Sequence, residues 1–262
     1  MTERRVRPPS CSRRLLETTV WPFEAAAFWG LQPLLRTMGR GDEHPVLLLP
    51  GFAAGDRSTV PLRWVLRGQG YWAHAWQLGR NIGPTKRAVS GMRRRLEELH
   101  GKQGRRVSIV GQSLGGIYAR MLARESPELV RQVITLGSPY RMVEGDRSSA
   151  QRYWRHVEHL HDGDLPLRSV AEHDRPALVV PATSIYSRSD GIARWQTCID
   201  VVGPLAENIE VYGSHVGMGV NPAVVYAVLD RLGQPEDDRQ PFRPPLPLRP
   251  WYRRSADWRG AA

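Results

Sequence analysis

Short runs of apolar residues alternate with helical patterns along the middle of the chain. Between Lys86 and His100, apolar residues recur every three or four positions and charged residues fill the others, which predicts a surface helix that covers a sheet. The apolar runs are short and are bounded by glycine, proline or polar residues, as buried strands are. We expect strands at Val46–Leu49, Tyr71–Leu78, Val107–Val110, Val133–Leu136, Ala177–Ile185 and Asn208–Tyr212. The alternation predicts an α/β protein with a mostly parallel central sheet flanked by helices.

The remaining helices follow from periodicity and from capping residues. Ser126-Pro127-Glu128 has the chemistry of a helix start, with a capping hydroxyl before a proline in the first turn. We therefore expect a short helix there, before the fourth strand. Other helices are predicted around Trp64–Leu66, from Leu114 to about Arg124, weakly from Arg152 to His161, and at Pro222–Leu232.

These elements divide the chain into regions. We expect a basic N-terminal tail at 1–14, a helical segment at 15–44 and a main domain at 45–233. Within the main domain, the polar stretch at about 140–176 follows the fourth strand and is interpreted as a cap-like insertion over one end of the sheet. Proline and arginine dominate 234–262, so we expect that tail to be extended or disordered.

Length and charge exclude several classes of protein. A chain of 262 residues is long enough for one domain with an ordinary core. Its net charge of +11 is concentrated at the two ends, since 1–14 hold five arginines against one glutamate. That distribution favours solubility or attraction to an anionic surface over a dedicated nucleic-acid groove. The sequence also lacks a zinc-finger spacing, an RNA-binding signature and a basic heptad region, so we expect no nucleic-acid partner.

Two features bear on the compartment. The chain has only two cysteines, Cys11 and Cys198, which favours a reducing, cytoplasmic environment over secretion. Glu17, Pro22 and Glu24 interrupt the apolar stretch near the N-terminus, so it matches neither a signal peptide nor a spanning helix. Its aromatic residues leave two interpretations of residues 15–40 open: packing against the body of the protein, which we prefer, or peripheral contact with a membrane surface.

The clearest chemical motif is Gly111-Gln112-Ser113-Leu114-Gly115. This is a G-x-S-x-G sequence between an apolar strand and a helix that begins with small residues, which is the context of a nucleophile elbow. A serine on such a tight turn takes strained backbone angles and projects from the carboxyl end of the sheet, and glycines are needed on both sides to avoid collisions. We therefore expect Ser113 to be a nucleophile.

A nucleophilic serine needs a base and an acid that orients the base. His215 directly follows the last predicted strand in a short loop bounded by glycine, and it is the expected base. Asp190 lies in a polar turn after the strand that ends near Tyr186, and it is the expected acid. Asp200 and Asp174 are the competing acids.

An oxyanion hole needs two backbone donors. One is expected to be the N–H of Leu114, which begins the helix after the nucleophile. The other is expected in the turn after the first strand, at Phe52 or, failing that, at Ala53. Gly51 would let this turn approach the acyl group closely.

At these residues the chain resembles a bacterial α/β-hydrolase of the lipase and esterase branch. The resemblance covers roughly Pro45 to Leu232. It rests on five segments: Leu49-Pro50-Gly51-Phe52, Gly111-Gln112-Ser113-Leu114-Gly115-Gly116, Leu136-Gly137-Ser138-Pro139, Tyr186-Ser187-Arg188-Ser189-Asp190-Gly191 and Gly213-Ser214-His215-Val216-Gly217. The chain departs from the family at Pro50, where such enzymes usually carry histidine. The resemblance implies the α/β-hydrolase fold and a serine hydrolase that acts on a small-molecule or lipid ester.

Other functions and sites remain open at this point. The same triad would serve an acyltransferase or a thioesterase, and the fold could also serve as a noncatalytic binding module. Phe52, Trp154 and Trp195 are expected to bind substrate, although the two tryptophans could equally be core residues. His156, His159, His161 and Asp162 are close in sequence, but the histidine–aspartate pattern of metallo-hydrolases is not reproduced, so we expect neither a metal nor a cofactor. The sequence does not indicate an oligomeric state.

Overall fold

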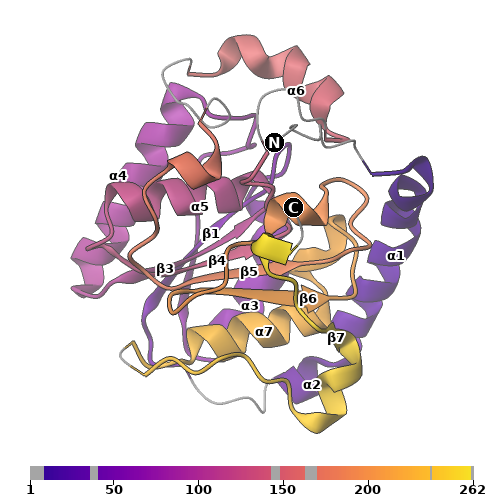
Figure 1. The fold of residues 1–262 in the computed structure, drawn as a ribbon. Helices are drawn as coiled ribbons and strands as arrows, with labels where there is room; N and C mark the ends of the chain where they lie inside the picture. Colours follow the sequence, from indigo (N-terminus) through magenta and orange to yellow (C-terminus); the bar gives the residue numbers. More distant parts are fainter. Residues whose placement is uncertain (1–8, 36–40, 143–147, 163–169, 237, 261–262) are drawn as a thin grey trace.

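A mostly parallel sheet forms the centre of the molecule (Figure 1). The computed structural model describes residues 9–35, 41–142, 148–162, 170–236 and 238–260. Within these residues the sheet has seven strands in the order β2-β1-β3-β4-β5-β6-β7. The strands are β1 (Pro45–Leu49), β2 (Trp72–Ala75), β3 (Val107–Gln112), β4 (Val130–Leu136), β5 (Ala182–Tyr186), β6 (Ala206–Val211) and β7 (Tyr252–Arg253). All neighbours pair in parallel except β7, which pairs antiparallel with β6.

The strand β1 is a continuous, fully buried apolar run, as expected where both faces of a sheet are covered. Alternate residues of β1 enter different cores: Val46 and Leu48 belong to one, and Leu47 and Leu49 belong to the other. The helices α4 (Lys86–Gln103) and α5 (Leu114–Glu125) cover the second core, above the sheet in Figure 1, whereas α3 (Val60–Gly68) and α7 (Pro222–Leu232) cover the first from below. The predicted α/β architecture is therefore confirmed.

Two helices have clear capping residues at their ends. The Thr85 hydroxyl accepts a hydrogen bond from the Ala88 N–H at 3.1 Å and begins α4, and Gly104, at φ 61°, ends that helix in the left-handed conformation. The α7 helix begins at Pro222, and the side chain of Asn221 caps its first turn.

One predicted helix is absent. Ser126 to Leu129 form a turn, in which the Leu129 N–H donates to the Ser126 carbonyl at 3.1 Å. The prediction of a helix there is wrong because β4 already begins at Val130. The Leu129 carbonyl also accepts from the Val107 N–H at 2.8 Å, which joins this turn to the first residue of β3.

The C-terminal region was expected to be extended or disordered, and its described part is instead ordered on the domain. A 3-10 helix at Leu246–Trp251 leads into β7, and Phe242, Trp251 and Tyr252 pack against the core beneath α7. The Tyr252 hydroxyl donates to the Ala223 carbonyl at 2.7 Å. These aromatic residues, spaced among prolines, cover an edge of the sheet.

The N-terminal segment is helical, as predicted, and begins earlier than position 15. It forms α1 (Cys11–Gly30) and the short α2 (Gln32–Leu35), and the buried Phe28 and Leu35 join the core. The inner face of this segment thus packs against the body of the protein. Within the described part of the chain, no helix combines the length and the apolar character that crossing a bilayer requires.

The predicted insertion at 140–176 lies partly outside the described residues. Its described part contains α6 (Gln151–Val157), which is continued by a 3-10 turn at Glu158–Leu160. Figure 1 shows α6 at the top of the molecule, beyond α4 and α5. Through Trp154 this helix contacts Phe52 of the loop after β1, with 5.2 Å between ring centroids.

Candidate active site

Ser113 lies between the end of β3 and the beginning of α5. Its backbone angles, φ 52° and ψ −120°, are in a region that residues with a side chain rarely adopt. Such a conformation costs about 1–3 kcal/mol and persists only where the surroundings impose it. Here the Ser113 N–H still donates to the Leu136 carbonyl of β4 at 2.8 Å, so the sheet holds the strained residue in place.

The glycines of the motif are required by close backbone contacts. A Cβ atom at Gly111 would lie 2.3 Å from the Gly115 carbonyl oxygen, and one at Gly115 would lie 2.2 Å from the Leu49 carbonyl oxygen. No real Cβ atom tolerates such distances, so α5 could not follow β3 this tightly with side chains there. The predicted reason for the spacing, which is to avoid collisions at the turn, is the one that the structure shows.

Asp190 and His215 form a buried pair at the carboxyl ends of β5 and β6. The His215 Nδ1 and the Asp190 Oδ2 are 2.6 Å apart, and the two residues are 7% and 2% exposed. The other carboxylate oxygen accepts from the backbone N–H groups of Ile192 and Ala193 at 2.8 and 2.7 Å. A carboxylate on Nδ1 selects the tautomer whose Nε2 carries a free lone pair, as a general base requires.

Burial and nearby charges set the pKa of His215. Burial by itself lowers the pKa of His215, but the negative charge and hydrogen bond of Asp190, together with the charge of Glu17, raise it above the ordinary 6.5. The net direction follows from the paired charges, because an imidazolium beside two carboxylates is favoured over a neutral ring. The histidine is thus prepared to accept a proton.

The structure links the histidine to the segment that carries Ser113. The side chain of Gln112 donates from Nε2 to the His215 carbonyl at 2.9 Å. Among the described residues, no hydrogen bond joins the Ser113 hydroxyl to the imidazole. Hydrogen bonds of this kind are often long before substrate binds and shorten in the reacting complex.

Two backbone N–H groups near Ser113 are available to an incoming oxygen. Leu114 is the first residue of α5, where helical N–H groups have no acceptor in their own helix. The Phe52 N–H finds no acceptor within the described residues, whereas the Ala53 N–H donates to the Asn81 carbonyl at 2.7 Å. Of the two expected donors in the loop after β1, Phe52 is therefore the available one.

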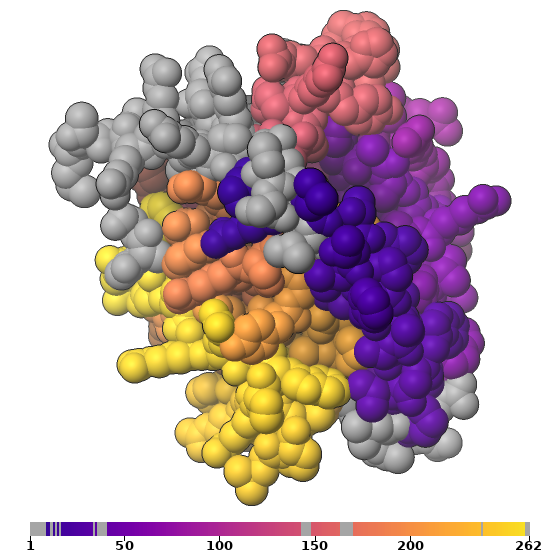
Figure 2. Space-filling view, turned by 90° about the vertical axis from the view of Figure 1, so that its right-hand side faces the viewer, coloured from indigo at the N-terminus to yellow at the C-terminus, as the bar shows by residue number. Residues whose placement is uncertain are grey.

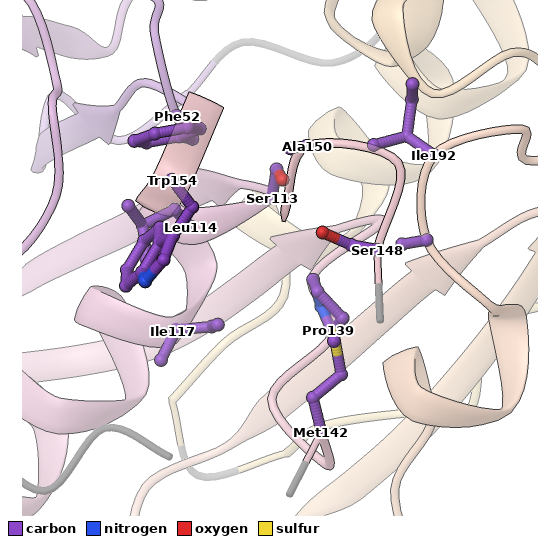
Figure 3. Close-up of a pocket in the computed structure, with 11 residues that line it drawn as sticks. Phe52, Ser113, Leu114, Ile117, Pro139, Met142, Ser148, Ala150, Trp154 and Ile192 are labelled. Carbon is purple, nitrogen blue, oxygen red and sulfur yellow. The ribbon is translucent and has the colours of Figure 1, made fainter. Parts of the chain in front are cut away.

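An apolar pocket opens beside Ser113 (Figure 3). Figure 3 shows Phe52, Leu114 and Trp154 together on one side of the serine and Ile192 on the other. Trp154 comes from α6, so the described part of the insertion contributes to the wall. The lining consists of Phe52, Ser113, Leu114, Ile117, Pro139, Met142, Ser148, Ala150, Trp154, Ile192 and Ala193.

Trp195 lies apart from this pocket. Its ring stacks on Tyr186, with 5.7 Å between centroids, and packs beside Cys198, Ile199 and Trp258. The expectation that Trp195 binds substrate is therefore not supported. The residue follows Asp190 closely in sequence, but the chain turns away from the pocket after Ala193.

The competing acids have other partners. Asp200 forms ion pairs with Arg120 at 2.8 Å and Arg141 at 2.9 Å, and Asp174 is exposed in the insertion. Of the histidines in this stretch, His161 has partners of its own: its Nε2 lies 2.8 Å from the Ile82 carbonyl oxygen, and its ring contacts Trp154. Within the described residues, no group of three or more histidine, cysteine or acidic side chains could hold a metal ion.

A second serine–histidine–aspartate arrangement occurs at the opposite end of the sheet. His44 precedes β1, its Nε2 lies 2.8 Å from the Ser108 hydroxyl, and its Nδ1 contacts Asp42. His44 and Ser108 are both fully buried, and burial lowers the pKa of His44 to about 4 although Asp42 opposes the shift. No substrate can reach a hydroxyl in this position, so the arrangement is structural.

Sequence reasoning missed the contribution of α1. Its two acids, Glu17 and Glu24, are buried and accept hydrogen bonds from the loops that carry Asp190 and His215. They are seven positions apart, which places them on one face of a helix, and this spacing was the available signal.

Comparison with known proteins identifies the fold. No protein-family model and no curated protein matches the sequence. Among solved structures, lipase B of Aspergillus fumigatus superposes with a TM-score of 0.55 at 16% identity, over 76% of this chain and 55% of the lipase, so the chain spans about half of that lipase. A pyrethroid hydrolase superposes with a TM-score of 0.51 at 17% identity, over 74% of this chain and 99% of that one. A Bacillus licheniformis lipase in its mature form gives 0.50 at 15%, over 73% and 92%. The topology of the sheet, the elbow at Ser113 and these superpositions together show that the chain has the α/β-hydrolase fold.

Proposed function

We propose that this protein is a serine hydrolase that cleaves carboxylic esters through an acyl-enzyme on Ser113. The observation that carries the proposal is the combination of a strained serine at the end of β3 with the buried Asp190–His215 pair, beside an apolar pocket. Each feature has structural explanations by itself. Their combination at the carboxyl end of one parallel sheet is the arrangement that acyl transfer needs.

The reaction proceeds in two halves. His215 Nε2 removes the proton of the Ser113 hydroxyl while the oxygen attacks the ester carbonyl carbon, and Asp190 stabilises the imidazolium. The negative charge that develops on the carbonyl oxygen is held by the N–H groups of Leu114 and Phe52. When the intermediate collapses, the C–O bond to the alcohol breaks and the alkoxide takes the proton from His215. Water then attacks the acyl-enzyme by the same route, and Ser113 regains its proton.

The pocket suggests the kind of acyl group. Apart from Ser113 and Ser148, its lining is apolar, and none of the lining residues is charged. Trp154 and Phe52 present aromatic rings beside the serine. An uncharged, apolar acyl chain fits such a wall, because burying it gains about 0.8 kcal/mol per methylene group.

A covalent probe tests the proposal. A fluorophosphonate should label the folded protein at Ser113, and Ser113→Ala should not react. A series of nitrophenyl esters of increasing chain length then reports the acyl preference, with Ser113→Ala as the control for background hydrolysis. Labelling at another residue would overturn the assignment of Ser113, and an unreactive wild-type protein would overturn the proposal and favour a noncatalytic binding module.

The same acyl-enzyme could pass its acyl group to an acceptor other than water. Adding an alcohol or a thiol during turnover separates the outcomes. A transferred ester or thioester as the main product would assign an acyltransferase, whereas free acid as the main product supports hydrolysis. A thioester substrate that is preferred over its oxygen ester would assign a thioesterase.

A further inference from the structure

Glu17 links the two loops of the candidate active site through a single carboxylate. Its Oε1 accepts from the Gly191 N–H at 2.7 Å and from the His215 N–H at 2.9 Å, and its Oε2 accepts from the Val216 N–H at 3.0 Å. The residue is 4% exposed. One oxygen atom therefore bridges the residue after the acid and the histidine itself, although these loops follow different strands.

We propose that Glu17 is a positioning residue for the Asp190–His215 pair, an assignment that rests on the proposed function. Charge-assisted hydrogen bonds are about twice as strong as neutral ones. Three of them on one buried carboxylate hold the spacing between the two loops. A small error in that spacing is costly, because a displacement of about 1 Å in a catalytic group can lower turnover about 100-fold.

The glycines of the two loops support this role. A Cβ atom at Gly191 would lie 2.3 Å from the Arg13 carbonyl oxygen of α1, and one at Gly217 would lie 1.8 Å from Glu24 Oε2. Both loops therefore carry glycine at positions where α1 leaves no room for a side chain. In Figure 2, α1 lies in indigo along the face of the molecule, next to the orange segments that include these loops.

Glu24 offers a matched comparison on the same helix. It is also buried, and its carboxylate accepts from the Ser214 N–H at 3.0 Å, from the Ser214 hydroxyl and from the Asn221 amide at 2.8 Å. Glu24 does not bond to the Asp190 loop. Of these two carboxylates, only the charge of Glu17 contributes to the raised pKa of His215, where it adds to Asp190. A role in folding is common to both glutamates, whereas the effect on the histidine belongs to Glu17.

The experiment compares Glu17→Gln with Glu24→Gln. We expect Glu17→Gln to lower kcat by about 10- to 100-fold with little change in KM, and to move the acidic limb of kcat/KM to lower pH, since the negative charge near the imidazolium is lost. Glu24→Gln should lower the melting temperature about as much as Glu17→Gln does, but it should leave the acidic limb of kcat/KM at the wild-type pH. If the two variants show the same limb, the positioning role is wrong.

A second measurement does not depend on turnover. In a Ser113→Ala background, an NMR titration of the His215 imidazole, assigned with His215→Ala, should give a lower pKa in Glu17→Gln than in the parent and an unchanged one in Glu24→Gln. If Glu17→Gln does not fold, Glu17→Asp should retain the raised pKa of His215 but lose kcat, because its shorter side chain cannot reach both loops. If the pKa of His215 is the same in Glu17→Gln as in the parent, the inference is overturned even if the protein is a hydrolase. A shifted pKa of His215 in a protein without esterase activity would overturn the proposed function and, with it, the role of Glu17 in positioning a catalytic pair.

The outer face of α1 supports a second inference, which does not depend on the first. From Leu15 to Gly30 the only charged residues are Glu17 and Glu24, and both are buried. The surface of the helix is instead apolar and aromatic, with Phe23 76% exposed and Trp29 58% exposed. The rings of Trp29 and Trp64 in α3 have their centroids 5.6 Å apart, and this contact extends the aromatic surface.

We infer that this face binds a lipid surface with anionic headgroups. Tryptophan and phenylalanine on an uncharged helical face are the residues that enter the boundary between headgroups and acyl chains. The arginines of the sequence that precedes it, Arg4, Arg5, Arg7 and the exposed Arg13, complement anionic lipid. An apolar helical face that follows a basic stretch of sequence matches this occupant better than it matches a neutral protein surface.

Vesicle sedimentation tests the second inference. Wild-type protein should pellet with vesicles of phosphatidylcholine and phosphatidylglycerol, and less so as salt rises. The double variant Phe23→Ser/Trp29→Ser should reduce the bound fraction at least about tenfold. Trp72→Ser, at an exposed tryptophan on β2, is the matched control and should bind normally. The inference fails if wild-type protein stays in the supernatant, or if the double variant instead abolishes a dimer detected by light scattering.

Discussion

Replacing Ser113 by glycine should abolish ester hydrolysis and yet leave a more stable protein than replacing it by alanine. Alanine retains the Cβ atom and therefore the strain of φ 52° and ψ −120°, whereas glycine adopts such angles without steric cost. Both variants lack the hydroxyl, so neither can form an acyl-enzyme. The comparison isolates the backbone strain at position 113.

The magnitude follows from two opposing terms. Relief of the strain contributes about 1–3 kcal/mol to the free energy of unfolding. Against this, the greater freedom of glycine in the unfolded chain costs about 0.5–1 kcal/mol. We therefore expect Ser113→Gly to exceed Ser113→Ala by about 1 kcal/mol, which corresponds to about 2–4 °C in melting temperature for a chain of this size.

Thermal unfolding followed by circular dichroism measures the difference. Ser90, which is exposed on α4 and donates to the Lys86 carbonyl, is the control. There the order should reverse, with Ser90→Gly about 1 kcal/mol less stable than Ser90→Ala, because glycine is a poor helix former. If glycine is also the less stable residue at position 113, the elbow is not strained and the reasoning is refuted.

Four further predictions concern the site. Asp190→Asn should lower kcat by about 10⁴-fold without unfolding the protein, because the amide favours the wrong tautomer of His215; an unchanged kcat would show that Asp190 is not the orienting acid. In wild-type protein, the acidic limb of the kcat/KM profile should have its midpoint above pH 6.5, because the raised pKa of His215 means that the base becomes protonated at a higher pH than an ordinary histidine does; a midpoint below 6.5 would contradict this. Trp154→Ala should raise KM for long-chain esters more than for acetate esters, whereas Trp195→Ala should leave that ratio unchanged. Gly217→Ala should lower the free energy of unfolding by about 2 kcal/mol in chemical denaturation, because its Cβ displaces the Glu24 carboxylate from charged hydrogen bonds; wild-type stability would mean that α1 adjusts freely.

Local pattern was sufficient for the centre of the fold. The apolar runs that became β1 and β3 are short and lack polar alternation, and only a sheet covered on both faces buries such runs completely. The glycines around Ser113 are equally informative, because the collisions that they avoid involve the next turn of the same strand–helix unit and the adjacent β1. Asp190 and His215 could be proposed because each follows a strand, and parallel strands end at one edge of the sheet.

Other features depend on contacts that no local pattern contains. The turn at Ser126–Leu129 carries helix-start residues, but β4 begins too soon for a helix to form. Trp195 is close to Asp190 in sequence, but its ring stacks on Tyr186 instead of lining the pocket. This placement comes from tertiary packing after Ala193, which the position of Trp195 in the sequence does not reveal. The C-terminal region becomes an edge strand only because β6 offers unpaired backbone groups.

The sequence by itself therefore determined the layered architecture and the residues that could carry the chemistry. Periodicity and glycine spacing reflect interactions over a few residues, and chain order acts through the regular geometry of a parallel sheet. All three can be deduced from the order of residues. Only the tertiary structure decided that Glu17 meets Gly191 and His215, nearly the whole length of the domain away in sequence. A buried carboxylate is stable only with its donors, and those donors are brought to it by the packing of α1 on the finished fold.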